Sequence, residues 1–328
     1  MDIKPKIPPV PVLRLYRINA GSCNGCDVEL AATAALTRFS VEELGCSFTE
    51  DPTHADIVLI TGPLTVRVRE KVLRSFAEVP EPKVTVAIGV CPISGGVFRD
   101  SYAVSGPVDS YLPVDVNVPG CPPRPQAIVA GIAQAANLWR TGRYGALASS
   151  VTTLATEPAG ADNLNPDLSD NSSAASQPGL RGKMHFNAAA CVGCRMCEHV
   201  CAGGAIRFEE QAGGGLRFTL WHNSCAFCGL CSHYCPTKAL AATGEWQLAH
   251  LQQDKYRQVE QGSVPLVPCS GCGTPMLPVA PELLRVAYRS VSRETAQLQT
   301  LCTECRQQRN AQLNVAALRP RGKGVPPP

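Results

Sequence analysis

Two copies of the pattern C-x2-C-x2-C-x3-C dominate residues 191–235. The first copy reads CVGCRMCEHVC and the second reads CAFCGLCSHYCP, and the copies repeat at a constant offset, Cys191 to Cys225 and Cys201 to Cys235. Three closely spaced thiolates can bind three corners of one metal centre, but the chain cannot turn back within three residues to supply the fourth. The fourth ligand therefore comes from the other copy, which predicts two interlocked sites. One site takes Cys191, Cys194, Cys197 and Cys235, and the other takes Cys225, Cys228, Cys231 and Cys201.

This spacing is the one by which bacterial ferredoxins hold two [4Fe–4S] clusters. A pair of zinc knuckles or a disulfide framework fits less well, because a zinc site needs four ligands of its own and not interlocked sets of four. The repeat also predicts a pseudo-symmetric α+β fold for this segment. We therefore expect this part of the chain to transfer electrons.

Composition places the remaining cysteines in the same chemical class. Seventeen cysteines would indicate disulfides in a small secreted protein. The opening residues MDIKPKIPPVPV contain no apolar signal core and no twin arginine, and no run of about 18 apolar residues indicates a membrane span. We therefore expect reduced, intracellular cysteines that bind metal. A net charge of +3 is too small to favour nucleic acid as a partner.

Residues 1–143 alternate between strand-like and helix-like segments. Short runs rich in valine and isoleucine are followed by longer amphipathic runs, which predicts an α/β fold with a flavodoxin-like parallel sheet covered on both faces. The expected strands are 12–18, 56–62, 83–90 and 114–118, with another beginning at Cys46, and the expected helices are 27–39, 66–79 and 124–139.

The sequence divides into five segments by composition. The α/β domain is expected at 1–143, and a flexible linker rich in Ala, Ser, Asn, Asp and Pro is expected at 144–182. The two-cluster ferredoxin domain follows at 183–248. A small cysteine-containing module is expected at 262–312, and 313–328 is expected to be disordered.

Four early cysteines each lie just after the end of an expected strand. Cys23 and Cys26 follow the first strand in GSCNGCD, Cys91 follows Val90, and Cys121 lies in VPGCPP. The carboxyl ends of parallel strands meet at one edge of the sheet, where open α/β sheets bind their ligands. Four thiolates without a histidine favour a soft, sulfur-rich centre, either [4Fe–4S] or zinc.

This domain resembles the small subunit of membrane-bound, energy-converting [NiFe] hydrogenases, including that of formate hydrogenlyase. The resemblance covers about residues 12–140 and is carried by GSCNGCDVEL, HADIVLITGP, GVCPISGGVF and VPGCPPRP. The complex I subunit nearest the quinone has a similar fold, but it typically has two adjacent cysteines where this chain has Cys23 and Cys26. The spaced pair favours the hydrogenase branch. The ferredoxin segment likewise resembles the two-cluster subunit of both assemblies.

The resemblance implies a function and several partners. The cluster on Cys23, Cys26, Cys91 and Cys121 would be proximal to a nickel–iron site on a separate large subunit. Glu29 is a candidate for proton transfer at the interface with that subunit, and the alternative is that it stabilises the positive N-terminus of the following helix. Membrane subunits of the same complex and a redox protein, such as a ferredoxin or a formate dehydrogenase, are the other implied partners. The chain would then be a non-catalytic, electron-transfer subunit of an oxidoreductase, held at the inner face of the cell membrane by its partners.

Two C-x2-C pairs near the C-terminus predict a further metal site. Cys269 and Cys272 form the first pair and Cys302 and Cys305 the second, and residues 273–301 separate the pairs. Four cysteines in two pairs suit a structural zinc ion in a zinc-ribbon-like module, and a rubredoxin-like iron or a fourth cluster is the alternative. The expected cofactors are therefore three [4Fe–4S] clusters and one Zn²⁺.

Two other functions remain open from the sequence. One is a complex I-like quinone or ferredoxin oxidoreductase whose large subunit lacks nickel. The other is a redox-sensing or iron–sulfur-handling protein, which would have exposed clusters and would be stable without a partner. A hydrogenase subunit would instead have an apolar docking face around Cys23 and Cys91.

Overall fold

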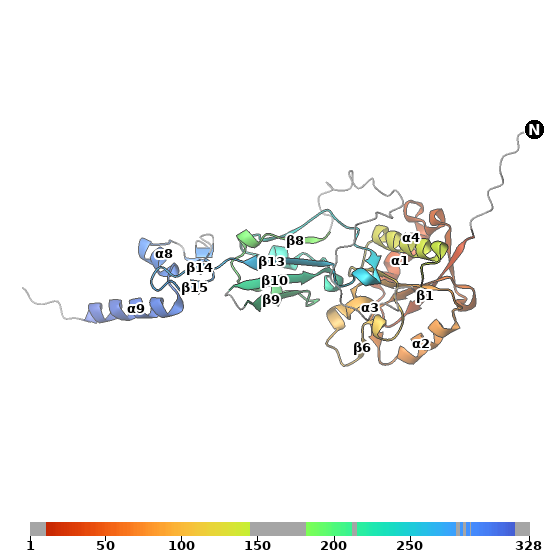
Figure 1. The fold of residues 1–328 in the computed structure, drawn as a ribbon, viewed down its shortest axis with the longest axis horizontal. Helices are drawn as coiled ribbons and strands as arrows, with labels where there is room; N and C mark the ends of the chain where they lie inside the picture. Colours follow the sequence, from red (N-terminus) through yellow and green to blue (C-terminus); the bar gives the residue numbers. More distant parts are fainter. Residues whose placement is uncertain are drawn as a thin grey trace, which may run out of the picture.

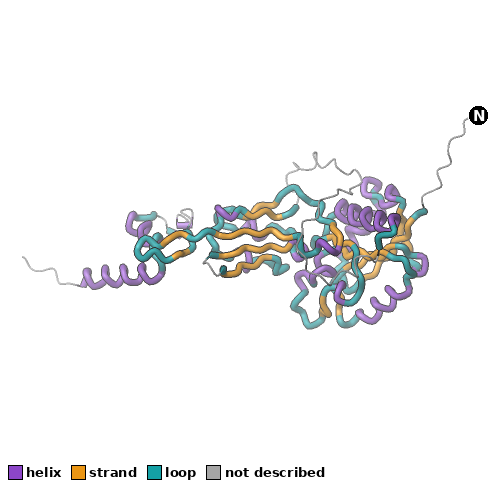
Figure 2. The backbone as a smooth tube through the Cα atoms, viewed as in Figure 1, coloured by secondary structure: helices purple, strands orange, loops and turns teal. Residues whose placement is uncertain are grey.

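A computed structural model of the chain describes residues 11–144, 182–211, 215–279, 283–284, 287–288 and 290–318. Apart from its two end residues, the linker expected at 144–182 lies outside the described residues. The described parts follow one another along the long axis of the molecule, as an α/β unit, a middle unit with the cysteine repeats and a small C-terminal module (Figure 1). Figure 2 shows the longer strands of the middle unit running along this axis.

The α/β unit contains a six-stranded sheet with the order β12-β7-β5-β3-β1-β2. All neighbouring strands except the β12–β7 pair are parallel. Counted along the chain, the parallel strands have the order 2-1-3-4-5, as in flavodoxin-like folds. The predicted parallel sheet is therefore confirmed. The strands are β1 (Leu13–Asn19), β2 (Cys46–Thr49), β3 (Ile57–Thr61), β5 (Val84–Ile88), β7 (Val116–Val118) and β12 (His250–Leu251).

Helices cover both faces of this sheet, and alternating side chains of the strands pack against them. Ile57 and Leu59 of β3 belong to the core on the side of α1 and α4, whereas Val58 and Ile60 belong to the core on the side of α2 and α3. Burial on both faces explains why the central strands read as continuous apolar runs. The helices are α1 (Gly25–Ala35), α2 (Arg69–Glu78), α3 (Val90–Ser94) and α4 (Pro125–Thr141), and a hairpin pairs β4 (Leu64–Thr65) with β6 (Val104–Gly106).

The middle unit packs small sheets and two short helices around aromatic side chains. Phe218 is fully buried, stacks on Phe186 with ring centroids 3.8 Å apart and meets Phe208 edge-on. One sheet has the order β13-β10-β9 and the other pairs β11 with β8. The elements are β8 (Met184–Phe186), α5 (Met196–His199), β9 (Ile206–Glu210), β10 (Leu216–Trp221), α6 (Leu230–His233), β11 (Leu240–Ala242) and β13 (Val259–Val264).

A strap, residues 246–258, connects the middle unit back to the α/β unit. Within it β12 pairs antiparallel with β7 and so adds a sixth strand to the sheet of the α/β unit. The chain then returns to the middle unit as β13, which pairs with β10. Nothing in the sequence pattern indicates this excursion, because β12 contains only two residues, His250 and Leu251. The strap therefore links the two units through strand pairing.

Buried polar contacts hold the strap in place. The Lys255 ammonium is 2% exposed and donates to Asp109 Oδ2 at 2.5 Å, and Gln252 Nε2 donates to the same oxygen at 2.8 Å. On the side of the middle unit, Asn223 Nδ2 donates to the Lys255 carbonyl oxygen at 2.7 Å and lies 3.1 Å from His250 Nε2. The strap thus bonds to both units at once.

The C-terminal module combines a short hairpin with helices. Helix α9 continues to Leu318, beyond residue 313, where the sequence predicted the start of a disordered tail; residues 319–328 lie outside the described residues. None of the helices in the described parts of the chain is both long and apolar enough to cross a membrane. The elements are β14 (Val267–Pro268), β15 (Pro275–Met276), α8 (Arg293–Gln299) and α9 (Thr303–Leu318).

Substitution of Asp109 tests the strap. Asp109→Asn leaves the buried Lys255 ammonium without its counter-charge, and we expect a loss of about 3 kcal/mol in stability, which lowers the melting temperature by roughly 6–12 °C. Arg257→Gln is the matched control, since Arg257 pairs with Asp254 while 76% exposed, and its loss costs under about 1 kcal/mol. Equal shifts in the two variants, measured by thermal unfolding of the full chain, would contradict this account.

Candidate metal centres

Four thiols of the α/β unit gather at the carboxyl-terminal edge of its sheet. Cys23 and Cys26 follow β1 at the start of α1, Cys91 lies in α3 directly after β5, and Cys121 follows β7. Cys26 and Cys91 are buried, Cys121 is half-buried and Cys23 is exposed. Burial and, after it, the charges of the other three thiols raise the pKa of Cys26 to about 12. The structure thus brings together the four cysteines that the sequence singled out.

A glycine lets the backbone approach these sulfurs closely. Gly89 has φ 92°, and a Cβ atom at this position would lie 2.6 Å from the Cys26 sulfur. A Cβ atom on Gly96 would lie 3.3 Å from the Cys91 sulfur. The thiols therefore face backbone instead of side chains, which leaves room for a bulky inorganic group.

The middle unit surrounds its sulfurs with backbone N–H donors in a repeated pattern. In each copy of the repeat, one N–H donates to the first cysteine from two residues downstream, and another donates to the last cysteine from four residues downstream. Hydrogen bonds to the sulfurs are one of the ways in which a protein sets the potential of a cluster. The donors are Gly193 to Cys191 and Phe227 to Cys225, each at 3.4 Å, and Ala205 to Cys201 and Ala239 to Cys235, each at 3.2 Å.

The backbone conformation repeats as well as the hydrogen bonds. Positive φ values recur at equivalent positions of the two copies, and in each pair one residue is a glycine and the other is not. The pairs are Gly193 (64°) with Phe227 (51°), Arg195 (57°) with Gly229 (78°), and Gly204 (55°) with Lys238 (54°).

The last cysteine of each copy lies near cysteines of the other copy. Burial is the main cause that raises the pKa of Cys225 to about 12, and the charge of Cys201 is among the smaller causes. Burial likewise raises the pKa of Cys191, and Cys235 is among the thiols that add to this effect. The thiols are thus close enough to interact across the two copies, and the assignment of ligands to each cluster stays a prediction.

The two units meet where a metal centre of each would lie. Ser94, in the helix that carries Cys91, donates its hydroxyl to Ser224 at 3.3 Å, and Ser224 directly precedes Cys225. Ser224 is fully buried and also donates to the Gly203 carbonyl oxygen at 2.8 Å. This junction was invisible in the sequence, because a single serine before a cysteine carries no signal of a contact 130 residues away.

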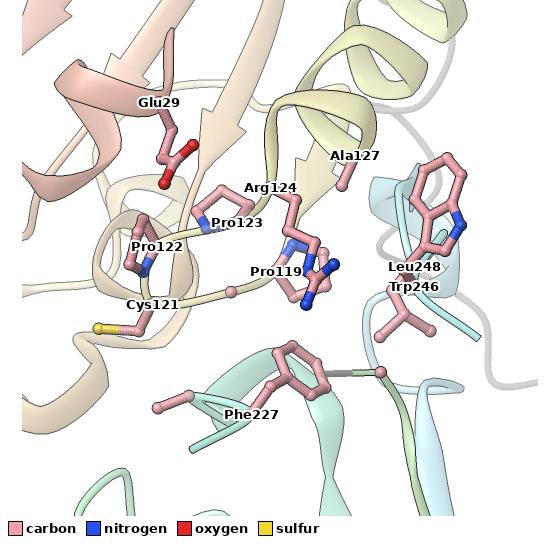
Figure 3. Close-up of a pocket in the computed structure, with 13 residues that line it drawn as sticks. Glu29, Pro119, Cys121, Pro122, Pro123, Arg124, Ala127, Phe227, Trp246 and Leu248 are labelled. Carbon is pink, nitrogen blue, oxygen red and sulfur yellow. The ribbon is translucent and has the colours of Figure 1, made fainter. Parts of the chain in front are cut away.

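Cys228 of the middle unit lies at the same junction, near Cys121 of the α/β unit. Burial raises the pKa of Cys121, and the charge of Cys228 is among the causes that add to it. A cavity of about 260 Å³ lies beside Cys121 between the units, and Phe227 and Trp246 also line it. In Figure 3 Glu29 points from α1 toward Pro122 and Pro123 at the rim of this cavity. Glu29 therefore lies near the sulfur site, and its part in proton transfer stays a prediction.

The C-terminal cysteines form the tightest group of thiols. Among the described residues, this is the set of four whose sulfurs all lie within 4.8 Å of one another, and the Cys272 and Cys302 sulfurs are 3.6 Å apart. Cys269 and Cys272 lie in the turn between β14 and β15, whereas Cys305 lies in the first turn of α9. The second pair thus sits at a helix start instead of in a second hairpin.

The protonation of this group also indicates a cation site. Backbone N–H groups, first that of Cys302, donate to the Cys269 sulfur and lower its pKa to about 6. Hydrogen bonding with Cys272 raises the pKa of Cys305 to about 12. Four thiols so close together cannot all ionise unless a cation compensates their charge.

Two families match the two parts of the chain. Residues 23–135 match the family of the NADH ubiquinone oxidoreductase 20 Kd subunit, and residues 190–239 match the 4Fe-4S dicluster domain. A probable membrane-bound hydrogenase subunit of Pyrococcus furiosus is 47% identical over 118 residues, which make up 36% of this chain and 70% of that protein.

Two further relatives match the same region. Formate hydrogenlyase subunit 7 of Escherichia coli is 44% identical over 124 residues, covering 38% of this chain and 48% of that protein. An NADH-quinone oxidoreductase subunit of Heliobacterium modesticaldum is 45% identical over 107 residues, covering 32% of this chain and 61% of that protein. The chain therefore spans about half to two thirds of the length of these two relatives.

Substitution of Ser224 tests the junction between the units. Ser224→Ala leaves the buried Gly203 carbonyl without its donor. We expect the free energy of unfolding to fall by about 1–3 kcal/mol. Hydrogen–deuterium exchange of the full chain should become faster at residues 201–205 and 222–226. Ser263→Ala, at an exposed position of β13, should change stability by less than about 0.5 kcal/mol. Unchanged exchange in the Ser224 variant would show that the junction does not depend on this hydroxyl.

Proposed function

The chain belongs to the family of the NADH ubiquinone oxidoreductase 20 Kd subunit, and we propose that it is the iron–sulfur electron-transfer subunit of a multi-subunit [NiFe] hydrogenase. The observation that carries this proposal is the placement of three cysteine sets in series along one chain. In this role the chain breaks no substrate bond, and it is a non-catalytic subunit of an oxidoreductase.

We assign one [4Fe–4S] cluster to each of the three wider cysteine sets. All of their cysteines are among the described residues, and none of these sets has its four sulfurs within 4.8 Å of one another, which suits a cube whose iron atoms stand between the thiolates. Three cubes would pass single electrons between an external donor or acceptor and the nickel–iron site of a partner large subunit. The sets are Cys23, Cys26, Cys91 and Cys121; Cys201, Cys225, Cys228 and Cys231; and Cys191, Cys194, Cys197 and Cys235.

The contacts between the units support an order for the sets. Cys228 lies close enough to add to the rise in the pKa of Cys121, and Ser94 bonds to Ser224, so we place the set with Cys201 next to the α/β unit. The set with Cys191 lies toward the C-terminal module, since a Cβ atom on Gly193 would lie 2.7 Å from a Leu277 methyl group. The first set would thus face the large subunit and the last would face the external redox partner.

Exposed apolar side chains support docking of a large subunit beside the first set. Val28 lies in α1 just after Cys26 and is 68% exposed, and Phe98 lies shortly after α3, which carries Cys91, and is 45% exposed. Tyr102 is almost fully exposed. We propose that these exposed side chains contribute to the surface on which the large subunit docks, with Glu29 as the candidate for proton transfer near the first set.

The hydrogenase branch is preferred to a complex I-like quinone or ferredoxin oxidoreductase because of one spacing. Cys23 and Cys26 are separated by two residues, as in the hydrogenase small subunits that the sequence resembles, and complex I relatives typically have adjacent cysteines there. Membrane subunits would hold the complex at the inner face of the cell membrane, with a ferredoxin or a formate dehydrogenase-type protein as redox partner.

Metal analysis tests the assignment. The complex, purified anaerobically through a tag on this chain, should contain about one nickel and roughly thirteen iron atoms per chain, of which about twelve belong to three cubes. Iron near twelve without nickel would favour the complex I-like alternative. Gly89→Ala places a methyl group against the Cys26 sulfur and should remove about four iron atoms, whereas Gly142→Ala, with nothing within 4 Å, should remove none.

We further propose that Cys269, Cys272, Cys302 and Cys305 hold one structural Zn²⁺. A zinc ion with four Zn–S bonds of about 2.3 Å holds its sulfurs roughly 3.8 Å apart, and the Cys272 and Cys302 sulfurs are 3.6 Å apart. A cube would keep the thiolates further from one another. Such an ion would join the β14–β15 turn to α9 and so fold the module.

Substitution of one ligand tests the zinc site. Cys272→Ser should lower zinc from about one per chain to near zero, leave iron unchanged and make the module sensitive to protease. Cys46→Ala is the control and should leave every metal unchanged, because Cys46 is paired with Leu13 at the start of β1, the end of that strand opposite to Cys23. A fall of about one iron atom instead of zinc would identify a rubredoxin-like iron at this site.

A further inference from the structure

Arg99 belongs to the α/β unit, but its side chain ends on the middle unit. It follows the short turn Gly96–Phe98 after α3, and its Nη1 donates to Ser224 Oγ at 3.4 Å. A Cβ atom on Gly204 would lie 2.3 Å from its Nη2, so the guanidinium rests directly on the turn at Gly204. The Arg99 side chain is 37% exposed, so most of it is out of solvent in the docked arrangement.

The two contacts of Arg99, the turn at Gly204 and Ser224, each lie next to a ligand of the same proposed cluster. The Gly204 N–H donates to the Cys201 carbonyl oxygen at 3.0 Å, and the next N–H, of Ala205, donates to the Cys201 sulfur at 3.2 Å. Ser224, the other contact of Arg99, directly precedes Cys225. The cation therefore stands beside the set that contains Cys201 and Cys225.

The second copy of the repeat shows what Gly204 leaves room for. Its counterpart in the second copy is Lys238, which has almost the same φ and whose N–H likewise donates to the carbonyl oxygen of the last cysteine, Cys235. The backbone at this position therefore accepts a side chain, and in the second copy that side chain is a cation. In the first copy the position is a glycine, and the space above it is taken by the guanidinium of Arg99 from the other unit.

We propose that Arg99 raises the reduction potential of the cluster on Cys201, Cys225, Cys228 and Cys231, and that it does so only while the two units are docked. The proposal rests on the function proposed above. A positive charge favours the reduced form of a cluster, which is the more negative one. Asp100 lies 3.6 Å from Arg99 Nε but is 92% exposed, so solvent screens its charge far more than that of Arg99.

Redox titration of the native complex, followed by electron paramagnetic resonance, tests the proposal. Arg99→Gln should make reduction of one cluster roughly tenfold less favourable, which is a fall of about 59 mV for a one-electron couple. Arg99→Lys keeps the charge and should keep most of the wild-type potential. Arg217→Gln removes the same charge from an exposed position of β10 and should leave the potential unchanged. The affected signal is assigned by its change in a Cys201→Ser variant.

The outcomes separate this proposal from the one on which it rests. An unchanged potential in Arg99→Gln, or equal falls in the Gln and Lys variants, overturns the role of the Arg99 charge while all cluster signals remain. If Arg99→Gln fails to assemble its clusters, Arg99→Lys decides: a retained wild-type potential supports the role of the charge, and a fall in the potential overturns it. Absence of the Cys201-dependent signal from the wild-type complex would instead overturn the ligand assignment.

Discussion

The contact between Ser94 and Ser224 is the one on which the arrangement of the cysteines depends. Cys91 lies in the same short helix as Ser94, and Cys225 follows Ser224, so one buried pair of hydroxyl groups determines how far apart two cysteine-bearing edges lie. Because both hydroxyls are buried, neither can exchange its partner for water without opening the interface. The proposed electron transfer between the units therefore depends on a contact that contains no metal ligand.

The parallel sheet and the gathering of four early cysteines at one of its edges could be predicted from the sequence, but the docking of the units could not. Cysteine spacing is a local signal, and the β-rich runs before Cys91 and Cys121 place those thiols at one sheet edge. The strap has no such signal: β12 is two residues long, and Lys255 reads as an ordinary surface lysine although it is 2% exposed. Its burial follows from Asp109, which lies in another unit and far away in the chain.

The two copies of the repeat in the middle unit are more alike in backbone conformation than in sequence. In each of three pairs of positive-φ positions one residue is a glycine and the other is Phe227, Arg195 or Lys238. A non-glycine residue in this conformation costs of the order of 1 kcal/mol. Since that strain is accepted once in every pair, the spacing of the cysteines, and the metal binding that it permits, imposes the backbone path more strongly than local preference does.

Strand β12 also changes how the two units can assemble. It adds to the edge of a sheet from outside, as an extended peptide does when it binds an exposed strand. If the two units were separate chains, this pairing would be an association between subunits and would depend on their concentration. On one chain it becomes an intramolecular equilibrium with a high effective concentration. The covalent fusion therefore makes one-to-one stoichiometry of the two units a property of the polypeptide itself.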